Sequence, residues 1–226
     1  MKDNLPHAEK LSYKIKWAYT ALTMLVVLFS LVLQFTISIL AAEDHGHSLA
    51  FSLGQLLSYF TILANLLVMK ILIIQLVAPK SYWGRFFSKP FAQTGIASYI
   101  TVVGLVYWVA LRGQWKPEGW FKLADDLLHT LNPLMFIIFW LVFAAKNNLI
   151  YKYIFTWLWF PLIYSIYIVI RGAIYNRYPY YFVDVSIMGY GRALIHFAAL
   201  MLLFMGMGAL FVWIGRLIAK PEKAAS

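Results

Sequence analysis

Long apolar runs separated by short polar connections dominate the chain. Six runs are long enough to cross a bilayer at about twenty residues per helix. They predict transmembrane helices at about 17–42, 53–78, 91–111, 126–145, 154–172 and 193–218. The expected fold is therefore all-α, a polytopic bundle of six transmembrane helices in one integral membrane domain over residues 1–226.

The second apolar run carries polar groups at regular intervals. Gln55, Ser58, Thr61 and Asn65 follow one another at steps of three, three and four residues, which places them on one face of a continuous helix. Polar groups are costly in lipid, so this face is expected to point toward other helices or a polar cavity. On such a helix Thr61 would lie roughly 12 Å from the start, at 1.5 Å per residue.

Other polar side chains are expected in the same half of the bundle. Asp125, His129 and Asn132 follow at steps of four and three residues in the fourth run, just before Pro133. The first, fifth and sixth runs add Gln34, Ser38, Tyr164, Tyr167, Arg171, Arg192 and His196. The opposite half is largely apolar inside. This asymmetry predicts a cavity or site that opens at the polar end.

The composition excludes a soluble globular protein. Hydrophobic residues make up 62% of the chain and charged residues 12%, against about 45–50% and 25% in soluble domains. The sequence has no cysteine, so it offers no thiolate chemistry and no disulfide. The segment 43–47, Glu-Asp-His-Gly-His, has metal-ligand residue types. Without further ligands a solvated loop is the simpler interpretation, and no metal is predicted.

The net charge of +10 is unevenly distributed. With connections assigned to alternate sides of the membrane, 13 of the 19 Lys and Arg residues fall on the side of the termini. Because cytoplasmic loops carry the excess of Lys and Arg, both termini are expected in the cytoplasm. Topology and contact with anionic lipid account for the charge, so no nucleic-acid partner is predicted. The sequence does not indicate any protein partner.

Aromatic residues gather where the predicted spans end, Tyr107 and Trp108 among them. Trp and Tyr suit the headgroup region because one end of each ring system is apolar and the other polar. We interpret them as an interfacial belt rather than as a binding pocket.

Thr61 and His129 together suggest chemistry as well as packing. A histidine beside a threonine can remove the hydroxyl proton, and the alkoxide can attack an ester carbonyl. Asp125, one turn before His129, is the candidate to orient the imidazole. Asn65 or a tyrosine hydroxyl could donate to the developing oxyanion. The alternative for Thr61 is a hydrogen bond to the Leu57 carbonyl one turn earlier, which is common in membrane helices.

Two other functions stay open on the residues alone. His129 and His196 are both near helix ends on the polar side and have the residue type of axial haem ligands. The polar cavity would also serve a small transporter, a channel or a lipid-binding protein without catalysis. The sequence shows no pair of Gly- or Pro-broken helices of the kind found in transporters.

Three motifs resemble one family of membrane proteins. They are Ser-Tyr-Phe-Thr-Ile-Leu-Ala-Asn-Leu at 58–66, Leu-His-Thr-Leu-Asn-Pro at 128–133 and Tyr-Pro-Tyr-Tyr-Phe-Val-Asp at 178–184. In order and approximate spacing they resemble the androgen-induced and androgen-dependent TFPI-regulating proteins, and more closely their bacterial relatives. The vertebrate members are intramembrane threonine hydrolases that act on fatty acid esters of hydroxy fatty acids.

This resemblance implies that Thr61 is the nucleophile and His129 the base. It covers the chain from the second to the sixth predicted helix. It implies a membrane lipid or lipid ester as substrate, no cofactor, and a place in the bacterial cytoplasmic (inner) membrane. Together with the polar pattern, it gives substrate-binding or supporting roles to Ser58, Asn65, Asp125, Asn132, Arg171, Tyr180, Asp184 and His196.

Overall fold

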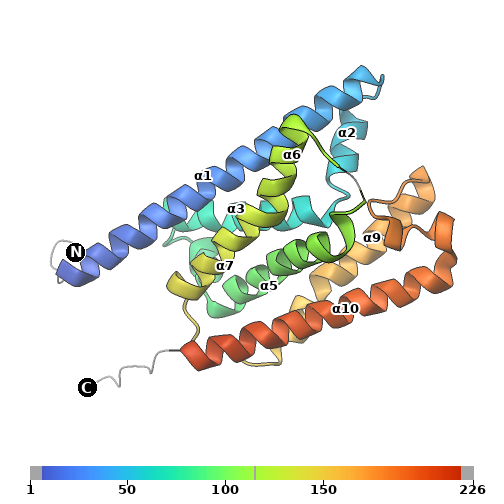
Figure 1. Ribbon diagram of the computed structural model, residues 1–226. Coiled ribbons are helices and arrows are strands. Elements are labelled where there is room, and N and C mark those ends of the chain that lie inside the picture. The colour runs from blue at the N-terminus through green and yellow to red at the C-terminus, as the bar shows by residue number, and fades with distance from the viewer. Residues whose placement is uncertain (1–6, 115, 220–226) are drawn as a thin grey trace.

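The fold is a bundle of helices, shown as a computed structural model in Figure 1, which describes residues 7–114 and 116–219. Helices or turns account for all the regular structure in these ranges. The elements are α1 His7–Asp44, α2 Leu49–Leu56, α3 Phe60–Val77, α4 Tyr82–Phe87, α5 Pro90–Val106, the π-helix η1 Tyr107–Leu111, α6 Gly119–Asp126, the π-helix η2 Leu127–Leu131, α7 Asn132–Phe143, α8 Tyr153–Trp157, α9 Trp159–Tyr175, the 3-10 turn η3 Tyr181–Val183 and α10 Val185–Ile218.

Within the described ranges, six helical segments are long and apolar enough to cross a membrane, which confirms the prediction of an all-α, multi-pass protein. They are Glu9–Asp44, Phe60–Val77, Pro90–Leu111, Gly119–Phe143, Tyr153–Tyr175 and Val185–Ile218. The start of α1 and the end of α10 lie at the same end of the bundle (Figure 1).

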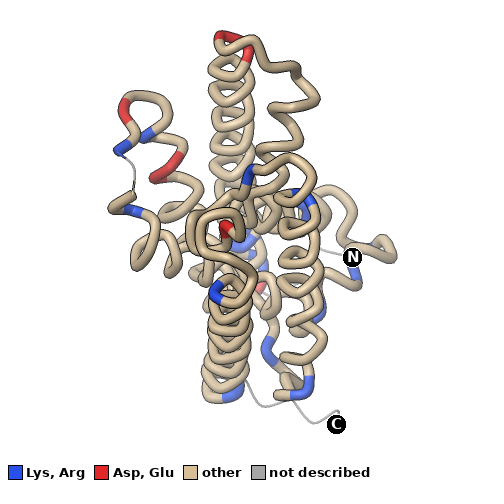
Figure 2. The backbone as a smooth tube through the Cα atoms, turned by 90° about the vertical axis from the view of Figure 1, so that its right-hand side faces the viewer, with Lys and Arg blue, Asp and Glu red and all other residues tan. Residues whose placement is uncertain are grey.

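Charge is unequal between the two ends of the bundle. Helix α1 ends in the acidic residues Glu43 and Asp44, and Figure 2 shows acidic residues at one extremity of the bundle and Lys and Arg at the opposite end. The cytoplasmic placement of the termini stays a prediction, based on this distribution and the positive-inside rule.

The helix α5 lies at the centre of the bundle. It packs against α3, α7 and α10, and most of its residues are buried. Small residues allow this close packing, as they do at many membrane helix interfaces. At Gly95, for example, a Cβ atom would lie 2.6 Å from Nε1 of Trp157.

The C-terminal end of α7 is held by two lysines, one just after the helix and one from α1. The buried Nζ of Lys146 donates to the carbonyls of Trp140, Leu141 and Ala144 at 2.6–3.0 Å. Lys16 Nζ on α1 donates to the Phe143 carbonyl at 3.2 Å. The last carbonyls of a helix have no intrahelical partner and carry partial negative charge, so ammonium groups stabilise this end.

We therefore expect Lys146→Ala to destabilise the fold. Removing the ammonium leaves buried carbonyls without donors, which costs about 1–3 kcal/mol. The melting temperature of the detergent-purified protein should fall relative to wild type. Lys152→Ala is the control, because this lysine is exposed nearby; an equal drop in both variants would contradict the capping role.

The second predicted span is not one continuous helix, and the prediction of a helix over 53–78 is wrong near its start, at residues 57–59. α2 ends at Leu56 and α3 begins at Phe60, with the cap residue Tyr59 extended at φ −86° and ψ 125°. The Ser58 hydroxyl donates to the Gln55 carbonyl, and the Tyr164 hydroxyl donates to the Ser58 carbonyl. These contacts satisfy backbone groups that the break exposes.

Two π-helical turns interrupt the spans next to α3. In η2 the Asn132 N–H donates to the carbonyl of Leu127, five residues earlier. Pro133 follows, and in a regular α-helix its ring would clash with the His129 carbonyl. The wider turn relieves this clash. Gly104 of α5 packs here, since a Cβ atom at that position would lie only 3.2 Å from the His129 carbonyl oxygen.

Candidate active site

The hydroxyl of Thr61 faces the imidazole of His129. Thr61 Oγ1 and His129 Nε2 are 3.1 Å apart, within the range at which a base can accept a hydroxyl proton. Thr61 is the second residue of α3 and not a residue deep inside a helix, as the continuous span had predicted. The contact requires α3 and η2 to be neighbours, and they are. The hydroxyl is thus directed at His129 and not toward the Leu57 carbonyl.

Asp125 holds the other nitrogen of the ring. Its Oδ1 lies 3.0 Å from His129 Nδ1, and its backbone carbonyl is also 3.0 Å from the same nitrogen. Two oxygen acceptors at Nδ1 favour the tautomer with the proton on that atom. Nε2 is then the free acceptor that faces Thr61. The three residues therefore have the connectivity of a nucleophile, a base and an orienting carboxylate.

Tyr107 of η1 contacts both Asp125 and His129. Its hydroxyl donates to Asp125 Oδ2 at 2.5 Å, and its ring stacks on His129 with centroids 4.3 Å apart and planes 13° from parallel. Tyr107 is 5% exposed. Its assignment to the interfacial belt was therefore wrong. Its place at the end of a span on the polar side was the only sign of this role in the sequence.

A buried amide network fixes α3 against η2 and α1. Asn65 donates from Nδ2 to the carbonyls of Thr61 and Leu128, at 2.9 and 3.3 Å. Asn132 Nδ2 donates to Asn65 Oδ1 and to the Ser30 hydroxyl, at 2.8 and 2.7 Å. Both amides are fully buried. Since both N–H groups of Asn65 are engaged, Asn65 positions the Thr61 backbone and is not free to bind an oxyanion.

Tyrosine hydroxyls surround the N-terminus of α3. The Phe60 N–H donates to the oxygens of Tyr180 and Tyr164, at 3.0 and 3.2 Å. Burial raises the pKa of the Tyr180 phenol above its ordinary value. Tyr180 therefore keeps its proton well above neutral pH. The Phe60 donation and the partial positive charge at the helix start strengthen that O–H as a donor.

The hydroxyl of Thr61 lies between two cavities of different character. The larger encloses about 480 Å³ and is lined by groups from α1, α2, η1, α6 and η2, together with the segment 179–181. Among its lining residues are Gln34, Ser38, Gln55, Asp125 and His129. This confirms that polar side chains from separate spans gather in one half of the bundle. Its volume falls within the range of small-molecule sites.

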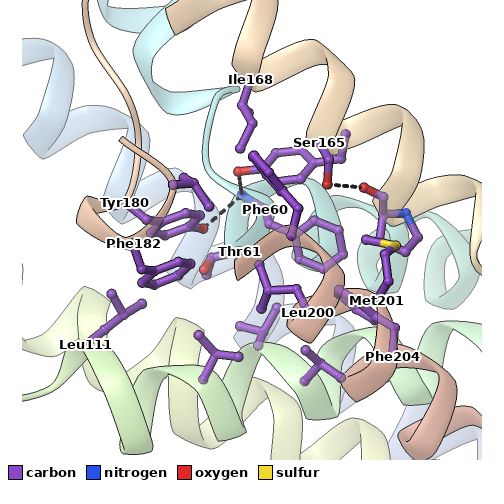
Figure 3. A pocket seen from close by; sticks show the side chains of 17 residues that line it. Phe60, Thr61, Leu111, Ser165, Ile168, Tyr180, Phe182, Leu200, Met201 and Phe204 are labelled. Atoms are coloured by element: carbon purple, nitrogen blue, oxygen red, sulfur yellow. Dashed lines mark hydrogen bonds between the residues drawn. The ribbon is translucent and has the colours of Figure 1, made fainter. Parts of the chain in front are cut away.

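The second cavity is smaller, about 50 Å³, and almost wholly apolar. Figure 3 shows Thr61 and Tyr180 at one side of it, with Leu200, Met201 and Phe204 of α10 at the other. Thr61 and Tyr180 line both cavities. A bound molecule at Thr61 would thus meet polar groups on one side and hydrocarbon on the other.

Four of the predicted supporting residues lie outside this centre. Ser58 braces the break between α2 and α3. Asp184 caps α10, where its Oδ1 accepts from the N–H and the hydroxyl of Ser186. His196 Nδ1 lies 2.6 Å from the Phe182 carbonyl, and its ring lines neither cavity at Thr61.

Arg171 is connected to the centre through one residue. Its Nη2 donates to Gln55 Oε1 at 3.0 Å, and Gln55 lines the larger cavity. The guanidinium therefore contacts a residue that lines the larger cavity, but it does not itself line that cavity or face Thr61.

Both histidines considered as haem ligands are held by other groups of the protein. Both nitrogens of His129 are engaged, by Thr61 and by Asp125, and His196 faces the Phe182 carbonyl. Across residues 7–114 and 116–219 no group of three or more His, Cys, Asp or Glu side chains could hold a metal ion. No family model, curated protein or solved structure matches this chain.

Proposed function

We propose that this protein is an intramembrane hydrolase of lipid esters, with Thr61 as nucleophile and His129 as general base. The observation that carries the proposal is the 3.1 Å contact between Thr61 Oγ1 and His129 Nε2, with Asp125 on the far side of the ring. A hydroxyl paired with an oriented imidazole is the signature of covalent ester hydrolysis. The motif resemblance to intramembrane threonine hydrolases points the same way.

The reaction has two steps that use these groups in turn. His129 takes the Thr61 proton while Oγ1 attacks the ester carbonyl carbon. The ester C–O bond breaks, and the imidazolium returns the proton to the departing alcohol. A water molecule, deprotonated by His129, then attacks the acyl-threonine. The fatty acid leaves and Thr61 regains its proton, so one ester and one water give one acid and one alcohol.

Tyr180 is the best placed donor for the oxyanion of each tetrahedral intermediate. Its hydroxyl accepts from the N–H of Phe60, the neighbour of Thr61, at 3.0 Å, and Tyr180 and Thr61 line the same two cavities. A donor fixed before reaction needs no reorganisation when charge develops on the carbonyl oxygen. The polar cavity supplies the water, and the apolar cavity suits carbon atoms next to the acyl carbonyl.

The substrate class follows from the setting. An ester that reaches Thr61 from the bilayer must be an amphiphile, as fatty acid esters of hydroxy fatty acids are. We also propose a bacterial cytoplasmic membrane as the location, with both termini in the cytoplasm. A transporter or lipid-binding protein would use the larger cavity equally well, but it would not need the Thr61–His129–Asp125 arrangement.

A fluorophosphonate probe tests the nucleophile directly. The probe should label the detergent-purified wild type, and peptide mass spectrometry should find the phosphonyl group on Thr61. His129→Ala should lose the label, because the hydroxyl is a weak nucleophile without its base. An adduct on another residue, or no adduct together with solute movement in liposomes, would reject the hydrolase in favour of the transporter.

A further inference from the structure

Arg171 of α9 is a buried cation that has no acidic partner among the described residues. Arg171 is 9% exposed and lies one turn before the end of α9. Within the described part of the chain no carboxylate lies within ion-pairing distance of it. Its hydrogen-bond partners are neutral, namely Gln55 Oε1 at 3.0 Å and the Arg177 carbonyl at 3.4 Å. Burial of an unpaired charge is unfavourable, especially at membrane depth, and it marks a functional position.

The guanidinium retains capacity for an anion. Arginine has five N–H donors in a planar fork, and two of them are used by these partners. The remaining donors suit a bidentate contact with phosphate or carboxylate oxygens.

Arg171 lines a groove on the outside of the bundle between α2 and α9. The groove encloses about 600 Å³. Its other walls are small, apolar or aromatic residues, namely Ser48, Ala50, Phe51, Gly54, Tyr167, Ile170, Ile174 and Tyr175. Ile170 and Ile174 are 56% and 69% exposed, as expected of side chains that face lipid. A buried arginine in the lining of an apolar groove is complementary to a lipid with an anionic headgroup.

A second cation reinforces this charge at the rim. The Arg177 guanidinium lies 5.1 Å over the ring of Phe51, and Phe51 lines both the groove and the larger cavity at Thr61. Arg177 is exposed. Basic pockets between transmembrane helices bind anionic lipid headgroups through the attraction between Arg or Lys side chains and phosphate groups.

We propose that the groove between α2 and α9 binds an anionic phospholipid of the bilayer, with its phosphate on Arg171 and its acyl chain along Tyr167 and Ile170, on the side of Arg171 away from the end of α9. The bound lipid lies next to the reaction cavity, separated from it by Phe51 and Gln55. Lipid binding in this groove does not depend on ester hydrolysis at Thr61. It can therefore be tested separately from the proposed function.

Lipid binding to the purified full-length protein tests this site. Native mass spectrometry with added phosphatidylglycerol or phosphatidylcholine should show at least tenfold tighter binding of phosphatidylglycerol by the wild type. Arg171→Gln should lose that preference, whereas Arg171→Lys should keep part of it. Arg192→Gln is the matched control, because Arg192 is an exposed arginine of α10. This substitution removes the same positive charge at the same end of the bundle. An unchanged preference in Arg171→Gln would overturn the proposal.

A second variant keeps the test decisive if Arg171→Gln does not fold. A Cβ atom at Gly54 would meet nothing within 4 Å, so Gly54→Leu should fill the groove without disturbing its surroundings. It should weaken phosphatidylglycerol binding while the melting temperature stays near that of wild type. Retained binding in Gly54→Leu, or competition by soluble glycerol phosphate at the same concentrations as the lipid, would exclude the groove as the lipid site. Thr61→Ala should bind the lipid as wild type does.

Discussion

Replacement of Thr61 by alanine should reduce the hydrolysis of a fatty acid ester by about 10⁴-fold or more, the scale on which loss of a triad nucleophile acts. The structure gives the reason. Thr61 provides the hydroxyl oxygen 3.1 Å from the base, and neither cavity offers another hydroxyl paired with a histidine among the described residues. The measurement is the release of free fatty acid in detergent micelles or proteoliposomes.

Two variants separate chemistry from packing in this experiment. Thr61→Ser keeps the oxygen and should retain most of the activity. Thr101→Ala is the matched control, since Thr101 is a membrane threonine whose hydroxyl donates to the Ala97 carbonyl one turn earlier. It should hydrolyse the ester like wild type. Full activity in Thr61→Ala would remove the nucleophile assignment.

Asp125→Asn should have the second largest effect, a loss of roughly 10³–10⁴-fold in kcat. An asparagine side chain can donate its N–H to His129 Nδ1, which favours the tautomer with the proton on Nε2. That nitrogen can then no longer accept the Thr61 proton. The melting temperature should change little compared with the loss of activity, because the amide occupies the same volume.

Tyr107→Phe tests the same Asp125 carboxylate with a smaller expected loss of kcat. Tyr107→Phe removes one charge-assisted hydrogen bond, worth about 1.5–3 kcal/mol, while the ring still stacks on His129. Its kcat should fall by roughly ten- to 100-fold, less than in Asp125→Asn. Asp126→Asn is the control, because Asp126 is exposed and pairs with Lys122. If Asp126→Asn lowered kcat as much as Asp125→Asn, the orienting role would be wrong.

The number and order of the spans could be predicted from sequence because each run carries its own signal. A helix in lipid must satisfy its backbone internally and present apolar side chains outward, so length and hydropathy suffice. The gathering of Thr61 and His129 in one half followed from the alternating direction of the spans. Their 3.1 Å contact could not be predicted. Periodicity indicates which face of a helix a residue lies on and how deep it lies in the membrane, but it does not indicate which helix packs against that face.

The break before Thr61 was missed because nothing local marks it. Leu57, Ser58 and Tyr59 are neither glycine nor proline, and the polar stripe continues through them in helical steps. The contacts that hold the break come from more than 100 residues away, through the hydroxyls of Tyr164 and Tyr180. Tertiary contacts of this kind override local propensity and are invisible to a pattern within one span.

Tyr107 was misassigned for a similar reason. A tyrosine at the end of a span is usually interfacial, and only the π-helical turn η1 places its hydroxyl on Asp125. The helical steps also gave no sign of the π-helical turn η2, although Pro133 marks its end. Sequence patterns assume 3.6 residues per turn, and both departures from that value lie at the candidate site.

The two π-helical turns also have a consequence for how such a site would change over evolution. A π-helical turn takes up more residues than the α-helical turn it replaces, and each α-helical residue rotates the chain by about 100°. Deletion of Leu127 or Leu128 would therefore shorten the spacing between Asp125 and His129 from four residues to three. The rotation of α6 about its axis would carry Asp125 away from the imidazole, although no site residue had been replaced. In this protein the spacing between residues is as much a part of the site as their identity, and relatives that keep every side chain but lose one position would be inactive copies of the same fold.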